Sequence, residues 1–195
     1  MTLPAALVLA SASPRRAQIL RALGVSFRVV VSGAEETLVA GEDAAAAAER
    51  LAREKAAAVA RSEPPPILGA DTLVVCDGRI LGKPDSPEEA RRMLQLLSGR
   101  THEVVTGLCL VAPSGTRSGV ERTAVTFAPM SAAEIDAYVA TGEPMDKAGA
   151  YHVDGRGALF VASVAGSPSN VAGLPVPLFR RLVREAGLDL GLPGR

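Results

Sequence analysis

Apolar residues recur along the chain in short runs, and these runs alternate between strand and helix patterns. Short apolar runs predict a buried strand at residues 7–10 and further strands at 27–31 and 67–76. Between them, apolar positions three or four residues apart predict helices over 14–24 and 42–61. This alternation of strands and helices is typical of an α/β fold.

The second half of the chain combines helices that have clear start signals with strands joined by tight turns. Ser86–Glu89 and Ser131–Glu134 match capping boxes, and Asp77–Gly78 matches a two-residue hairpin turn. We expect strands at 79–81, 103–111, 120–127 and 158–164, and helices at 87–97, 132–139 and 177–186. Parallel and antiparallel signals occur together, which predicts one mixed central sheet flanked by helices. A tail is expected over residues 188–195.

Two arginines at the start of the first predicted helix conflict with the helix dipole. Ser13 suits the N-cap and Pro14 the first helical position, and Arg15 and Arg16 follow in the first turn. A helix N-terminus carries partial positive charge, so it disfavours cations unless an anion binds there. A strand, a hydroxyl-rich turn and paired guanidiniums therefore favour a phosphate pocket. Solvated surface arginines are the alternative on these residues alone.

Composition narrows the class of protein. The 195 residues are 48% hydrophobic, and 21 basic residues balance 21 acidic ones. Such a chain can bury a core, and its zero formal charge argues against binding a nucleic acid polymer. Cys76 and Cys109 lie in apolar runs, which predicts buried, reduced thiols. No run approaches the roughly 18 apolar residues of a membrane span, so we expect a cytoplasmic protein without a membrane partner.

The main candidate for chemistry is a carboxylate inside an apolar strand. Asp71 interrupts the run that begins at Ile67, and its burial is costly unless it is paired, hydrated or bound to a metal. Gly69 and Ala70 leave room for a close approach beside it. Asp71 is predicted to be a metal ligand or a general base; the alternative is a solvent-exposed edge of the strand.

Other charged residues could complete such a site. Glu35 and Glu36 follow a predicted strand and could ligate Mg²⁺, and Lys55 and Lys83 could reach phosphate oxygens. For each of these residues considered singly, the alternative is an ordinary charge on the protein surface. The common glycine-rich nucleotide fingerprints do not occur, and neither histidine lies in the sequence context of a hydrolase triad.

Several blocks of sequence occur in one order over residues 5–186. They are Leu9–Arg16, Arg53–Lys55, Gly69–Thr72, Gly82–Pro84, Leu97–Gly99 with His102, Asp146–Tyr151 and Asn170–Pro175. Together they closely resemble the Maf family of nucleoside triphosphate pyrophosphatases, in the inosine triphosphate pyrophosphatase superfamily. Each block alone is a weak signal, whereas the ordered set is specific.

The resemblance implies hydrolysis of a nucleoside triphosphate to the monophosphate and pyrophosphate, with Mg²⁺ or Mn²⁺ as cofactor. By motif, it implies substrate binding by Ser11, Ser13, Arg15, Arg16, Lys55 and Lys83. It implies that Glu36 and Asp71 hold the metal and that Asp71 accepts the proton. It also implies one Maf-like domain over residues 1–187, two lobes with a deep cleft, a cytoplasmic homodimer and a house-cleaning role.

Within the family, the blocks at Asp71 and Tyr151 resemble the branch that acts on dTTP and UTP. The resemblance associates base choice with Arg15, Thr72 and position 154, where that branch usually has glutamine and this chain has Asp154. An ionised carboxylate accepts hydrogen bonds but cannot donate one to a base carbonyl. We therefore expect dTTP, UTP or modified pyrimidine nucleotides as substrates, with looser discrimination. A non-catalytic, nucleotide-sensing regulator of cell division is the alternative, and a nucleotidyl transferase a third.

Overall fold

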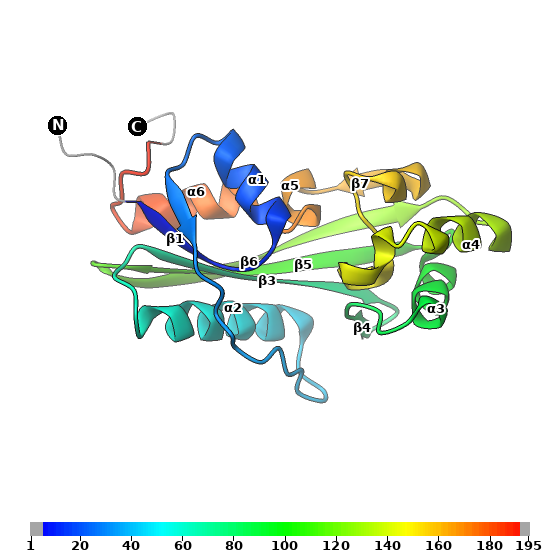
Figure 1. The fold of residues 1–195 in the computed structure, drawn as a ribbon, viewed down its shortest axis with the longest axis horizontal. Coiled ribbons are helices and arrows are strands. Elements are labelled where there is room, and N and C mark those ends of the chain that lie inside the picture. Colours follow the sequence, from blue (N-terminus) through cyan, green and yellow to red (C-terminus); the bar gives the residue numbers. More distant parts are fainter. Residues whose placement is uncertain (1–5, 192–195) are drawn as a thin grey trace. The chain divides into compact units, whose positions relative to one another are not determined.

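The computed structural model describes residues 6–191, and its central feature is a mixed sheet of seven strands (Figure 1). The strands are β1 (Leu7–Ala10), β2 (Phe27–Val29), β3 (Ile67–Cys76), β4 (Arg79–Leu81), β5 (Thr101–Ala112), β6 (Gly115–Phe127) and β7 (Val161–Ala165). Their order is β2-β1-β3-β5-β6-β7, and β4 pairs with β3. β1 is parallel to both β2 and β3, whereas the β3–β4 and β6–β7 pairs are antiparallel. The predicted mixed α/β fold is confirmed.

Six α-helices accompany these strands within the described residues. They are α1 (Pro14–Ala22), α2 (Ala44–Ala60), α3 (Pro87–Leu97), α4 (Ala132–Ala140), α5 (Pro168–Val171) and α6 (Val176–Glu185). Ser13 is the N-cap residue of α1 as predicted but makes no side-chain capping bond, and at α3 the capping box is incomplete because the Glu89 carboxylate accepts from Asp85 N. Ser86 Oγ caps α3 by accepting from Glu89 N, and Ser131 and Glu134 form the capping box of α4. Three 3₁₀ turns lie between α4 and β7, at Glu143–Asp146, Ala148–Ala150 and Arg156–Phe160.

Several strand boundaries differ from the sequence prediction: β2 ends at Val29 and not at residue 31, and β5 runs from Thr101 to Ala112 and not over 103–111. β6 begins at Gly115 and not at residue 120, because backbone pairing extends through a polar segment that has no apolar alternation. The predicted strand 158–164 is wrong at its start, because Ala158 and Phe160 belong to a 3₁₀ turn and β7 begins at Val161. The short helix α5 carried too few residues to show a helical period.

The described chain divides into two compact units. Unit 1 comprises residues up to Asp71, Thr106–Glu121 and the segment from Gly173 onward; unit 2 comprises Thr72–Val105 and Arg122–Ala172. β3, β5 and β6 each contribute residues to both units. At the C-terminal end, Leu190 is buried in the core of unit 1. Residues 1–5 of the predicted domain and 192–195 of the predicted tail lie outside the described residues.

In unit 1, helices cover both faces of the sheet (Figure 1). Leu7 and Leu9 of β1 belong to the apolar cluster that includes α1 and α6, while Val8 and Ala10 belong to the cluster that includes α2. Successive side chains of a strand point to opposite faces, so a strand covered on both faces is apolar throughout. This explains the unbroken apolar run at the start of the chain.

Helix α2 lies unusually close to the sheet because two strand positions are glycine. A Cβ on Gly69 of β3 would lie 2.1 Å from the carbonyl oxygen of Ala52, and one on Gly107 of β5 would lie 2.2 Å from that of Ala48. The alanine face of α2 therefore rests directly on the strand backbone. The space predicted beside Asp71 is filled by this helix.

Unit 2 has its own core, formed by α3, α4 and an aromatic cluster. His102, Phe127 and Tyr151 contact one another edge to face, and His102 Nε2 lies 3.0 Å from the Tyr151 hydroxyl oxygen. Cys76 in unit 2 and Cys109 in unit 1 are buried free thiols, as predicted, and burial raises the pKa of Cys109 to about 11. Within residues 6–191, no helix is long and apolar enough to cross a membrane.

Candidate active site

The loop after β1 is set beside the middle of β3 by strand pairing. Ala10 pairs with Gly69 in the parallel β1–β3 register, so Ser11 leaves β1 next to the residues that precede Asp71. Ser11 Oγ accepts hydrogen bonds from Ser13 N at 3.2 Å and from Arg16 Nη1 at 2.8 Å. The hydroxyl-rich turn is thus fixed to the first turn of α1.

Arg16 is a buried cation. Its residue is 8% exposed, and its Nε donates to the carbonyl oxygen of Gly173 at 2.9 Å. Burial lowers the pKa of Arg16 from its ordinary value, an effect opposed by the negative charges of Asp71 and Glu36. The alternative of a solvated surface arginine is therefore wrong for Arg16, while Arg15 in the same turn is half-buried.

Lys55 joins the two carboxylates that the sequence singled out. Its Nζ lies 2.6 Å from Asp71 Oδ1 and 2.7 Å from Glu36 Oε1. Asp71 is 4% exposed and Lys55 is 6% exposed, so the alternative of a solvent-exposed strand edge is wrong for Asp71. Leu51, Lys55 and Val59 share the buried face of α2 at a spacing of four residues. The structure thus brings together Ser11, Arg16, Glu36, Lys55 and Asp71, all in unit 1.

The segment that carries Glu36 is held by an arginine of α2. Arg50 donates from Nε and Nη2 to the Glu42 carboxylate at 2.9 and 2.7 Å, and from Nη2 to the Thr37 carbonyl oxygen at 3.1 Å. A bidentate hydrogen bond between a guanidinium and a carboxylate fixes the relative orientation of the two groups as well as the distance between them. The loop is thereby anchored one residue from Glu36. Glu35 and Glu36 are both exposed, but Glu36 pairs with Lys55.

The carboxylates of this cluster suit a magnesium ion that is completed by a substrate. Across residues 6–191, no group of three or more His, Cys, Asp or Glu side chains is arranged to hold a metal. Mg²⁺ is commonly bound by one or two carboxylates together with water and substrate phosphates. The pair Glu36 and Asp71 provides that donor set, so the residues present fit such an ion.

Three predicted site residues belong to unit 2. Thr72 is half-buried on β3, Lys83 is exposed in the turn after β4, and Asp154 is exposed in the turn after Tyr151. The two turns belong to segments that are bonded to each other, because Gly149 N donates to the carbonyl oxygen of Gly82 at 3.0 Å. The blocks around Lys83 and Tyr151 are therefore neighbours within this unit.

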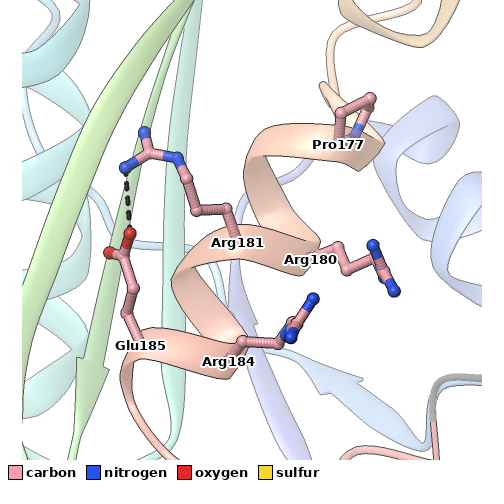
Figure 2. Close-up of a pocket in the computed structure, with 5 residues that line it drawn as sticks. All are labelled: Pro177, Arg180, Arg181, Arg184 and Glu185. Atoms are coloured by element: carbon pink, nitrogen blue, oxygen red, sulfur yellow. Dashed lines mark hydrogen bonds and ion pairs between the residues drawn. The ribbon is translucent and has the colours of Figure 1, made fainter. Parts of the chain in front are cut away.

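A separate hollow of about 290 Å³ lies along α6 (Figure 2). It is lined by Pro177, Arg180, Arg181, Arg184 and Glu185, and the Arg181 Nη1 and Glu185 Oε1 atoms pair at 3.1 Å. Figure 2 shows the arginine side chains extending outward from the helix. None of the predicted site residues lines this hollow.

Sequence reasoning missed the supporting residues of the cluster. Gly173 holds Arg16 through a backbone carbonyl, and its only signal was the block Asn170–Pro175. Arg50 gave no signal at all, since it resembles any exposed helical arginine. Backbone acceptors and loop anchors depend on contacts between distant segments, which a pattern along the chain does not encode.

Comparison with known proteins places the chain in a family. A family model described as Maf-like protein matches residues 6–186. The dTTP/UTP pyrophosphatases of Moorella thermoacetica and Anaeromyxobacter sp. are each 52% identical to the chain; both alignments cover 94% of it, with 96% and 91% of the relatives. Among solved structures, the Ham1 protein of Staphylococcus aureus has a TM-score of 0.45 and 15% identity, over 64% of this chain and 72% of that one. The chain therefore belongs to the Maf-like protein family.

Proposed function

We propose that the chain is a nucleoside triphosphate pyrophosphatase that hydrolyses dTTP and UTP to their monophosphates and pyrophosphate, in a house-cleaning role. The observation that carries this proposal is the cluster beside the turn at Ser11, in which the buried Arg16, Lys55 and Asp71 lie with the exposed Glu36 that pairs with Lys55. Relatives about half identical to the chain, and named dTTP/UTP pyrophosphatase, support the same reaction and base.

In this proposal, the residues of unit 1 divide into phosphate-binding and water-activating groups. Arg16 is held in place by Ser11 and Gly173, so its guanidinium is oriented before a phosphate arrives. Ser13 and the half-buried Arg15 belong to the same turn at the start of α1, where backbone N–H groups favour an anion. Asp71 orients the attacking water and accepts its proton, which a buried carboxylate can do once its cationic partner shifts to the phosphates.

A divalent cation, Mg²⁺ or Mn²⁺, is part of the proposal. Glu36 and Asp71 would hold it, and when bound it would neutralise the negative charge that spreads over the phosphates during hydrolysis. Lys55 and the exposed Lys83 add further positive charge for the triphosphate. Thr72 and Asp154, with Arg15, are proposed to select the base.

The proposal also includes a cytoplasmic location and a homodimer. The two buried free thiols, Cys76 and Cys109, agree with a reducing compartment. Sedimentation of the purified protein at several concentrations would test whether it forms dimers.

The direct test is a pyrophosphate-release assay on the full chain. Canonical and modified nucleoside triphosphates would each be supplied with Mg²⁺ or Mn²⁺, and products would be separated by ion-exchange chromatography. We expect equal amounts of monophosphate and pyrophosphate, fastest with dTTP and UTP, and one ¹⁸O atom from labelled water in the products. Binding without turnover would support the nucleotide sensor instead, and a requirement for an acceptor other than water would support a transferase.

A further inference from the structure

The oxygens that the proposed function gives to a metal ion are already in contact with a cation of the protein. Lys55 Nζ lies 2.6 Å from Asp71 Oδ1 and 2.7 Å from Glu36 Oε1, so one ammonium group joins the two carboxylates. These two carboxylates come from different parts of the chain, a loop before α2 and the middle of β3. Lys55 therefore does more than neutralise Asp71, because it also holds the carboxylates of Glu36 and Asp71 close to each other.

Lys55 and a divalent cation would compete for this pair. Two positive charges that contact the same oxygens repel each other, and the repulsion is strong where solvent is excluded. Lys55 is 6% exposed and its helix lies against Gly69, so its ammonium has little opportunity to satisfy its hydrogen bonds in bulk water. It needs new acceptors before it gives up the two carboxylates.

A nucleoside triphosphate would supply those acceptors. Its phosphate oxygens are the strongest anionic acceptors that the proposed reaction brings to the site. Arg16, held beside the same carboxylates by Ser11 and Gly173, fixes where such an anion binds. The transfer of the Lys55 ammonium from carboxylate to phosphate would therefore accompany substrate binding.

We propose that Lys55 blocks Glu36 and Asp71 against divalent cations until a triphosphate binds, and so couples metal binding to substrate binding. This inference rests on the proposed function, because it takes these two carboxylates as the metal ligands. The free protein binds divalent cations weakly as a result. Lys55 is thus both a phosphate-binding residue and a positioning residue for the metal ligands.

The test measures Mn²⁺ binding to the nucleotide-free protein by electron paramagnetic resonance of free Mn²⁺. Replacing the lysine by Lys55→Met removes the competing charge, and we expect at least about tenfold tighter Mn²⁺ binding. Lys55→Gln keeps a hydrogen-bond donor for the carboxylates and should show the same gain if the methionine variant folds poorly. Lys55→Arg keeps the charge and should bind Mn²⁺ as weakly as the wild type.

Two controls assign the effect to this pair. Arg53→Met removes one charge from an exposed residue of the same helix and should leave Mn²⁺ binding within about twofold of wild type, since exposed charges are screened. Asp71→Asn in the Lys55→Met background should abolish the gain. Equal Mn²⁺ affinity in wild type, Lys55→Met and Lys55→Gln would overturn the inference, as would a gain that survives Asp71→Asn. Failure of the proposed function has a different result, namely no pyrophosphate release by the wild type with any nucleotide.

Discussion

Asp71 is the residue whose chemistry the proposed reaction needs most. Its carboxylate is buried, paired with Lys55 and close enough to Arg16 to affect the pKa of that guanidinium. Asp71→Asn keeps the shape and one acceptor oxygen but removes the proton acceptor. We expect kcat to fall by roughly 10²–10⁴-fold, measured as pyrophosphate release from dTTP.

Loss of stability is a separate effect of Asp71→Asn. The substitution would leave Lys55 with Glu36 as its charged partner, so we expect a cost of about 1–3 kcal/mol in the free energy of unfolding. Asp136→Asn is the matched control, because it removes an exposed carboxylate that pairs with Arg91 on the surface. Near-normal kcat in a folded Asp71→Asn protein would require another base.

Base choice is tested at Asp154, which is exposed in a turn of unit 2. A glutamine amide offers a donor and an acceptor to a pyrimidine edge, whereas an ionised aspartate offers acceptors alone. If a carbonyl oxygen of the base faces the Asp154 carboxylate, two acceptors meet without a donor, which should weaken substrate binding by on the order of 1–3 kcal/mol. We therefore expect Asp154→Gln to raise kcat/KM for dTTP and UTP relative to dGTP. An unchanged ratio would leave base choice to Arg15, Thr72 or backbone groups.

Some residues of the candidate site could be predicted from the sequence, and others could not. Asp71 stood out because a charge inside an apolar strand must be compensated, and Arg16 because cations are disfavoured at a helix start. Lys55 was a candidate for phosphate binding, but its pairing with Asp71 and Glu36 was not predicted, because nothing in the sequence shows which carboxylates a helical lysine contacts. Gly173 lies 157 residues from the arginine that it holds, a distance over which no local pattern operates.

Helix α2 shows how an element places a side chain. Its contact with β3 depends on Gly69, and Lys55 follows three residues after Ala52, the point of closest approach. A methyl group at position 69 would meet backbone atoms, which cannot move without shifting the helix. We expect Gly69→Ala to destabilise the protein by about 1–3 kcal/mol, seen as a fall of several degrees in Tm, and to lower kcat.

Gly119→Ala is the matched control for this prediction. Its new methyl group would meet the flexible end of Arg181, which can turn aside, and Cδ1 of the buried Leu178 at 3.1 Å, which needs to shift by only a few tenths of an ångström. It should therefore leave Tm within about 2 °C of wild type. If both alanine variants behave alike, the close approach of α2 at Gly69 has no special role.

Elements with strong local signals were predicted almost to the residue. β1, β3 and β4 match their expected ranges, and the caps at Ser86 and Ser131 place the starts of two helices. The polar start of β6 and the 3₁₀ turn before β7 were not foreseen. The start of β6 is stabilised by pairing with a neighbouring strand, and the 3₁₀ turn before β7 is stabilised by the burial of Phe160. Both interactions join separate segments of the chain.

The stability of the molecule as a whole should depend on pH through His102 in the core of unit 2. Burial lowers the pKa of His102 to about 4 from its ordinary value of 6.5, and its residue is 2% exposed. The unfolded chain therefore takes up a proton at a higher pH than the native protein does. From this residue, we expect the free energy of unfolding to fall by about 3 kcal/mol as pH drops from 6.5 to 4, with no further loss below pH 4.

Urea unfolding at a series of pH values would measure this dependence. His102→Gln removes the titrating group and should flatten the decline between pH 6.5 and 4, relative to wild type. His152→Gln, at a half-buried histidine of the same unit, should keep the decline. A slope that is the same in wild type and His102→Gln would show that other groups control acid sensitivity.

The family resemblance implies two lobes, but no signal along the chain places the boundaries of the two units. β3, β5 and β6 are continuous strands that contribute to both units, and no linker marks the boundary between Asp71 and Thr72. The alternation of strands and helices predicts the fold class. The division into two units depends instead on which side chains pack together in each core.

The site cluster of unit 1 has two buried cations, Arg16 and Lys55, a buried carboxylate, Asp71, and an exposed one, Glu36, so these four charges cancel before any substrate arrives. We therefore expect inherited variation at these four positions to be interdependent. A lineage that loses one charge leaves another buried without its counterpart, and the second change is then favoured by the first. Natural replacements should occur as opposite-charge pairs, and a screen of single substitutions would overstate how much each position contributes alone.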